Sequence, residues 1–504
     1  METTVSTVVR TTGGAVRGTH EDGVFAFRGI PYAEPPVGDL RFRPPRRRAP
    51  WDGVLDATRF GAVQLQDPDP VEARMMNTAL RPAAGPDCLN LNVWTPEPGG
   101  AGLPVFVWIH GGSLKTGTGA DAFYDGSRFA RDGVVTVTIN YRLHAAGYLY
   151  VSGRPGAGAF GLLDQIAALE WVRGNIAAFG GDPDRVTVGG ESAGGHSVGQ
   201  LLAAPAARGL FRRAVLQSGS ASFDIAAPAA EVLGTAVLDH LGLTAADDDG
   251  IARLTDADVL AAYRAVEPRI GELLPDRNLM GVATGVLGLS TYGGDVVPVR
   301  ALDAIAAGSA EGVDVLIGTT LDEVLMFPPA FAQLAPVAAA VGFGPTGRTP
   351  DEVLAAYPGR TEYDRRARFL TDVLFRIPAI RLAEAAQRHG SRVYSYLLGW
   401  GTPPGDGRLG AFHGLDLPLM WNRLDDVASA ALTLVGRPAP VALAEAVHGA
   451  WVSFVTAGVP QHPALPVWPT YDTMRRATMW LDDESRVVDD PMGEQRELWR
   501  DVRY

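Results

Sequence analysis

The sequence contains very little cysteine and lysine. Cys88 is the single cysteine among 504 residues, so no disulfide can form within the chain. A chain of this kind suits a reducing compartment, and we expect a cytoplasmic protein. Lys115 is the only lysine, whereas alanine, arginine, glycine and proline are abundant, a bias typical of a high-GC bacterial genome.

Other sequence features exclude several classes of protein. Residues 1–8 include an acidic residue and lack the apolar core of a secretory signal. No apolar run approaches the length of about 20 residues that crosses a bilayer, so we expect no membrane partner. The net charge of -13 argues against nucleic acid as a partner. HExxH and EF-hand patterns are missing, so we expect neither a metal nor another cofactor.

The composition and the apolar runs predict an α/β enzyme domain. Hydrophobic residues make up 46% of the chain, which permits a large core. Segment 133–139 is apolar with little polar alternation, a pattern typical of a mostly parallel sheet covered by helices on both faces. We find no linker, so residues 1–504 are interpreted as one domain. The Ala-rich helical stretches 226–283 and 330–386 are interpreted as insertions that form the cap and walls of a cleft.

Two short motifs predict nucleophilic catalysis by serine. Gly190-Glu191-Ser192-Ala193-Gly194 follows a strand-like apolar run and precedes a helical stretch. That order raises a serine hydroxyl to the top of a sheet. Upstream, the apolar run 104–109 ends in His110-Gly111-Gly112-Ser113, where backbone N–H groups can turn toward a bound carbonyl.

These motifs and several others give the chain its resemblance to a known family. The matching segments are Phe27–Gly38, Asp87–Pro96, Asn140–Leu143, Phe179–Pro183 and Gln217–Ser220. With them, the chain resembles the type B carboxylesterase and cholinesterase family from its N-terminus to its last thirty residues. The resemblance implies an α/β-hydrolase fold with helical cap insertions. It also implies a serine carboxylesterase that works through an acyl-enzyme intermediate.

The resemblance supplies a catalytic triad residue by residue. Ser192 is the expected nucleophile. Glu323, in the run 313–327, matches the family's acid, and His413, in His413-Gly414-Leu415-Asp416-Leu417-Pro418, matches its base. Asp322 is the rival acid, one residue away. Independently of the family, the chain order Ser, Glu, His is the order expected of this hydrolase architecture.

The resemblance also suggests residues that support the triad. Gly112, Ser113 and Ala193 are the expected oxyanion donors, although the family typically has glycine or alanine where this chain has Ser113. Ser218 matches a family serine whose hydroxyl lies near the acid, and the alternative is a simple turn residue. Lys115 does not form an S-x-x-K pair, because Gly112 stands three residues before it.

The substrate is less well defined by the sequence. No aromatic residue occurs between Phe60 and Trp94, where a cholinesterase would hold a quaternary ammonium. We therefore expect an esterase for small uncharged carboxylic esters, acting as a monomer or weak homo-oligomer. Trp108, Trp171 and Trp451 are expected in the core. Two alternatives stay open: a carbamate or amide hydrolase with the same triad, and a non-catalytic binding protein of this family.

Overall fold

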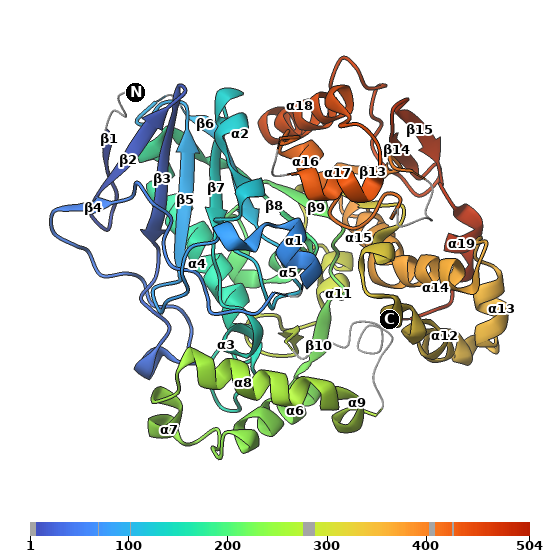
Figure 1. Ribbon diagram of the computed structural model, residues 1–504, viewed down its shortest axis with the longest axis horizontal. Helices are drawn as coiled ribbons and strands as arrows, with labels where there is room; N and C mark the ends of the chain where they lie inside the picture. Colours follow the sequence, from blue (N-terminus) through green and yellow to red (C-terminus); the bar gives the residue numbers. More distant parts are fainter. Residues whose placement is uncertain are drawn as a thin grey trace.

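The computed structural model describes residues 7–68, 70–100, 102–275, 288–402, 409–425 and 428–503, and Figure 1 shows their arrangement. These residues form a 13-stranded sheet and a separate two-stranded sheet. The strands are β1 (Thr7–Arg10), β2 (Ala15–Glu21), β3 (Val24–Pro31), β4 (Val54–Asp56), β5 (Asn90–Thr95), β6 (Leu103–Ile109), β7 (Val135–Ile139), β8 (Gly181–Glu191), β9 (Arg213–Gln217), β10 (Asp224–Ala226), β11 (Ser290–Tyr292), β12 (Asp314–Thr320), β13 (Val393–Leu398), β14 (Ala477–Leu481) and β15 (Arg486–Asp489).

The centre of the large sheet is parallel. The strand order is β1-β2-β3-β5-β7-β6-β8-β9-β12-β13-β14-β15, and β4 pairs with β2. Every pairing from β7 to β14 along this path is parallel, whereas antiparallel strands form both edges. The carboxyl ends of β6, β8, β12 and β13 therefore meet at one edge of the sheet, where ligands bind in open α/β sheets.

Helices cover both faces of this sheet, as the sequence predicts. On one face lie α4 (Phe160–Asn175), α5 (Ala193–Ala203), α11 (Ala301–Ala306) and α15 (Ile377–Gln387); on the other lie α2 (Ser127–Arg131), α16 (Asp416–Met420) and α18 (Val441–Ala457). Side chains alternate along β6, so Val107 joins the first buried cluster and Trp108 the second. Trp108 and Trp451 are fully buried in the second cluster, and Trp171 packs half-buried against the first.

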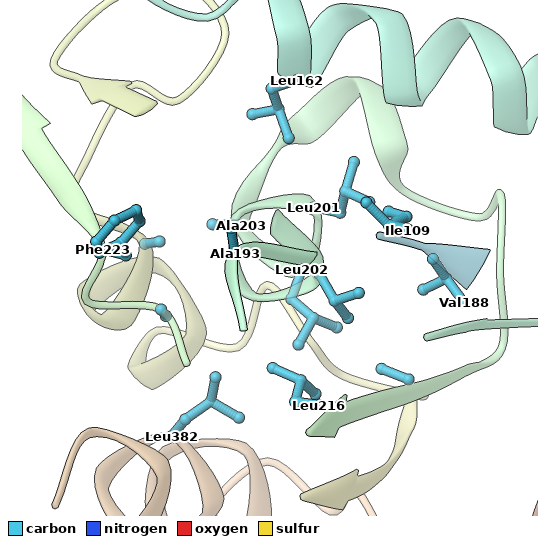
Figure 2. Packing of buried hydrophobic residues seen from close by; sticks show 14 of the residues in the cluster. Ile109, Leu162, Val188, Ala193, Leu201, Leu202, Ala203, Leu216, Phe223 and Leu382 are labelled. Atoms are coloured by element: carbon cyan, nitrogen blue, oxygen red, sulfur yellow. The ribbon is translucent and has the colours of Figure 1, made fainter. Parts of the chain in front are cut away.

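Helix α5 is fixed beneath the end of β8 by apolar packing. Figure 2 shows its residues Leu201 and Leu202 among side chains from strands and from neighbouring helices. Leu201 lies near Ile109 and Val188, while Leu216 lies between Leu202 and α15. Fully burying one such leucine contributes about 1.5–3 kcal/mol relative to leaving it exposed. Apolar packing thus holds the helix that follows Ser192 in a fixed position against the sheet.

The two predicted insertions are helical in their described parts. The first comprises α6 (Ala227–His240), α7 (Asp248–Ala252), α8 (Asp256–Val266) and α9 (Ile270–Leu273), which gather at the lower edge of Figure 1. Its residues 276–283 lie outside the described residues. The second contains α12 (Ala335–Phe343), α13 (Pro350–Ala355) and α14 (Glu362–Thr371). The prediction is wrong for α15, which packs on β12 and β13 and therefore belongs to the layer that covers the sheet.

Candidate active site

Ser192 lies at the sharp turn between β8 and α5. Its backbone has φ 55° and ψ -123°, a conformation that residues other than glycine rarely adopt. The N–H of Ser192 donates to the carbonyl oxygen of Gln217 on β9 over 2.9 Å, which holds the turn. A Cβ at Gly190 would collide with the backbone of Gly194, and one at Gly194 with the carbonyl of Ile109. Both glycines of the motif are thus required by close packing of the chain.

His413 and Glu323 contact each other beyond the ends of β13 and β12. Nδ1 of His413 lies 2.5 Å from Oε2 of Glu323, and Oε1 of Glu323 accepts the N–H of Thr320 over 2.8 Å. Glu323 is fully buried and His413 is 5% exposed. A carboxylate at Nδ1 places the proton of the neutral imidazole there, which leaves Nε2 as the basic nitrogen.

Asp322 binds the backbone of the loop that carries His413 and not its imidazole. Its Oδ2 accepts the N–H of Ala411 over 3.2 Å, and it lines a separate cavity of about 310 Å³ together with Arg368. Burial raises the pKa of the Asp322 carboxyl to about 6. The geometry therefore brings Glu323, rather than its neighbour, to His413.

Ser192 and His413 line a common cavity of about 330 Å³. Gly112 and Ser113 line it as well. Its apolar wall is built from Met75, Met76, Phe123, Tyr124, Met326, Phe327, Pro328, Phe331, Leu417, Pro418 and Ala431. The segment without aromatic residues contributes methionines through α1 (Pro70–Met75) and Met76, while aromatic rings enter the cavity from other segments.

The three expected oxyanion donors come from two segments. Gly112 has φ 103°, and Ser113 and Leu114 follow with φ 56° and 58°. Ala193 is the first residue of α5, whose N–H has no partner within the helix. Among the described residues, none of the N–H groups of Gly112, Ser113 and Ala193 donates a backbone hydrogen bond. The loop and the helix start thus offer available donors around the cavity that contains Ser192.

Glu191 is a site residue that the sequence reasoning missed. Its Oε1 lies 3.2 Å from Nε2 of His413, on the side of the imidazole away from Glu323. Glu191 is 5% exposed, and burial raises the pKa of its carboxyl to about 8. Burial alone would lower the pKa of His413, but Glu191 and Glu323 outweigh it and raise that pKa to about 9. The signal that could have revealed it is a charged residue directly after the uncharged, buried end of β8, residues 186–190.

Ser218 is buried at the end of β9, with φ 47°. Its N–H donates to the carbonyl of Gly318 on β12 over 2.8 Å, but its hydroxyl has no hydrogen-bond partner in the described part of the chain. The expected contact with the acid is therefore not seen, and the role of Ser218 stays a prediction.

The described ranges contain no group of three or more potential ligands arranged to hold a metal ion. Within the same ranges, no helix combines the length and apolar character needed to cross a bilayer.

The parallel sheet, the elbow at Ser192 and the histidine and acid on neighbouring loops define an α/β-hydrolase fold, and comparison with known proteins agrees. The model of the carboxylesterase family matches residues 5–337 and 357–499. The chain is 38% identical to the para-nitrobenzyl esterase of Bacillus subtilis (strain 168), over 97% of this chain and 98% of that protein. It is 36% identical to the phenmedipham hydrolase of Pseudarthrobacter oxydans, over 95% and 96% of the two chains.

A solved structure gives the same result. The carboxylesterase of Geobacillus stearothermophilus superposes with a TM-score of 0.84 at 36% identity, covering 98% of this chain and 100% of that one. The chain belongs to the carboxylesterase family and is a carboxylic ester hydrolase. The predicted family, fold class and ester hydrolysis are confirmed.

Proposed function

We propose that the protein hydrolyses uncharged carboxylic esters through an acyl-enzyme on Ser192, with His413 as base and Glu323 as its orienting acid. The observation that carries this proposal is the 2.5 Å contact between His413 and Glu323 at a cavity that Ser192 also lines. A serine hydroxyl becomes a strong nucleophile only when a base removes its proton. The buried Glu323 carboxylate would stabilise the imidazolium that forms.

The reaction proceeds in two halves. Nε2 of His413 takes the hydroxyl proton while Ser192 Oγ bonds to the ester carbonyl carbon, and the N–H groups of Gly112, Ser113 and Ala193 receive the oxyanion. The imidazolium then protonates the departing alcohol, which leaves an acyl group on Ser192. In the second half, neutral His413 activates a water molecule that releases the acid and restores the hydroxyl.

Preference for uncharged substrates is supported by the ion pairs of the cavity wall. Arg81 binds Asp121 and Glu72, Lys115 binds Glu267, and Asp67 binds Arg264. Because each of these charged side chains already has an opposite charge beside it, a charged substrate would have to compete for a partner. A neutral ester can occupy the apolar wall without that cost.

The proposed substrate class is tested with wild-type protein and the Ser192→Ala variant on matched neutral esters, carbamates and amides. We expect ester hydrolysis by the wild type and its loss in the variant. A larger kcat/KM for carbamates or amides would support the alternative substrate class, and an inactive wild type would support a binding protein.

We further propose a cytoplasmic bacterial protein that is a monomer or weak homo-oligomer. Cys88, the only cysteine, is a buried free thiol. This accords with the reducing compartment that the composition suggests. Cell fractionation and sedimentation of the purified protein test the location and the oligomeric state.

A further inference from the structure

Lys115 links the loop of the proposed oxyanion donors Gly112 and Ser113 to the first insertion. Its Nζ lies 2.7 Å from Oε1 of Glu267, at the start of the 3-10 turn (Glu267–Arg269) that follows α8. The hydroxyl of Tyr263 on α8 donates to the same Glu267 oxygen over 2.7 Å. Nζ also lies 5.9 Å from the centre of the Tyr263 ring, within the range of a cation–π contact. The only lysine of the chain therefore has two partners on one helical segment.

The loop before Lys115 needs such support. Ser113 and Leu114 both have positive φ, a strained conformation for residues other than glycine, so the surrounding structure must hold them there. Part of that support comes from the carbonyl of Gly112, which accepts the N–H groups of Lys115 and Thr116 over 2.9 and 3.0 Å. These bonds fix the turn internally. The side chain of Lys115 ties the turn to a distant part of the chain.

A second ion pair joins the same helix to the cavity. Arg264 on α8 pairs with Asp67, which lines the cavity with Lys115. No described residue of 226–275 lines the cavity itself. The first insertion therefore lies outside the cavity and forms ion pairs with two residues that line it.

An alternative role for Lys115 is direct binding of an anionic substrate, since 32% of its side chain is exposed. Glu267 opposes that role because it already neutralises the ammonium group at hydrogen-bonding distance. Because both partners are partly exposed, solvent and salt screen the ion pair, and its strength should fall as the salt concentration rises.

We propose that Lys115, held by Glu267 and Tyr263, is a positioning residue that aims the N–H of Ser113 at the oxyanion. This rests on the proposed function, in which Ser113 is a donor and Ser192 the nucleophile. Without the contacts of Lys115 to Glu267 and Tyr263, which we call the tether, the strained turn relaxes. The N–H of Ser113 then no longer points at the oxyanion. The apolar wall that binds the ester is unchanged. Stabilisation of the transition state falls, and ground-state binding does not.

The test compares Lys115→Met, Lys115→Arg and Glu267→Gln with wild type. Arg269→Gln is the matched control, because it removes a charge from the same segment and, among the described residues, breaks only the exposed pair with Glu272. For each protein, kcat and KM are measured with a neutral ester, and Ki with a neutral trifluoromethyl ketone, whose hemiketal on Ser192 carries an oxyanion. Glu267→Gln keeps the size of its side chain and serves if Lys115→Met does not fold.

We expect Lys115→Met and Glu267→Gln to lower kcat about tenfold, less than the 10²–10³ cost of deleting an oxyanion donor. Ki should rise by the same factor and KM should stay within about twofold, because the two quantities report the oxyanion and the ground state separately. Lys115→Arg should recover most of the activity. Arg269→Gln should match wild type.

Unchanged kcat and Ki in both variants would overturn the proposal, as would a rise in KM alone, which would indicate direct substrate binding. Ser192→Ala separates this failure from failure of the proposed function. If Ser192→Ala is inactive while Lys115→Met and Glu267→Gln are fully active, only the tether is wrong. If Ser192→Ala is active, the proposed function is wrong, and the proposed role of Lys115 is wrong as well.

Discussion

Oε1 of Glu191 lies 3.2 Å from Nε2 of His413, so the imidazole is held between two carboxylates, with Glu323 at its other nitrogen. Both carboxylates favour the protonated imidazole. In the proposed mechanism His413 must be neutral to act as the base, so Glu191 should influence how readily His413 loses its proton.

Replacement of Glu191 by glutamine should move the pH profile. As the proposed base, His413 works only when it is neutral, so kcat/KM should rise with pH through the pKa of His413, which is raised to about 9. Glu191→Gln removes a negative charge and should lower the midpoint by about 1–3 pH units. Glu191→Asp keeps the charge and is the control. An identical midpoint in wild type and Glu191→Gln would contradict the role of Glu191.

Glu323 and Asp322 should respond differently to neutral replacement. Glu323→Gln loses the charge at Nδ1 of His413, and we expect kcat to fall by about 10⁴ with the histidine in the wrong tautomer. Asp322→Asn keeps an acceptor for the N–H of Ala411, so kcat should stay within about threefold of wild type, since the bond it makes is structural. Steady-state kinetics of the two variants decide the assignment, and the opposite order of effects would make Asp322 the acid.

Ser113→Gly should leave catalysis intact. The proposed donor is the backbone N–H, which glycine also has, and φ 56° is freely accessible to glycine. Relief of backbone strain offsets the added entropy of the unfolded chain, so the free energy of unfolding should change by less than about 1 kcal/mol. Kinetics and denaturant unfolding check this. A loss of kcat beyond tenfold would mean that the hydroxyl takes part.

A choline ester should gain nothing over its neutral isostere. Phe123, Tyr124, Phe327 and Phe331 do line the cavity, but the segment between Phe60 and Trp94 contributes methionine side chains in place of an aromatic ring. The comparison is kcat/KM for butyrylcholine against 3,3-dimethylbutyl butyrate, which has the same shape without the charge. A preference of tenfold or more for the charged ester, about 1.4 kcal/mol, would reveal an ammonium site built from those rings.

The sequence predicts features that are encoded locally. The apolar run before Gly190 predicts β8, and the two glycines around Ser192 predict the turn, because each depends on a few adjacent residues. Glu191 could not be assigned in the same way. Its contact with His413 depends on how a distant loop folds over the sheet edge.

The partners of Lys115 cannot be predicted from the sequence either, because Glu267 lies in another element far along the chain. The alanine-rich sequence of α15 suits either a cap helix or a helix that covers a sheet. Only its contacts with β12 and β13 distinguish the two.

The site of covalent modification by a fluorophosphonate, read by peptide mass spectrometry together with residual esterase activity, tests most directly whether Ser192 is the nucleophile. If Ser192 is the nucleophile, each chain should carry one adduct, on the Ser192 peptide, formed in parallel with the loss of activity. No adduct should form in Ser192→Ala. Complete inactivation with the adduct on another residue, or esterase activity that survives in Ser192→Ala, would contradict the assignment of Ser192 as the nucleophile.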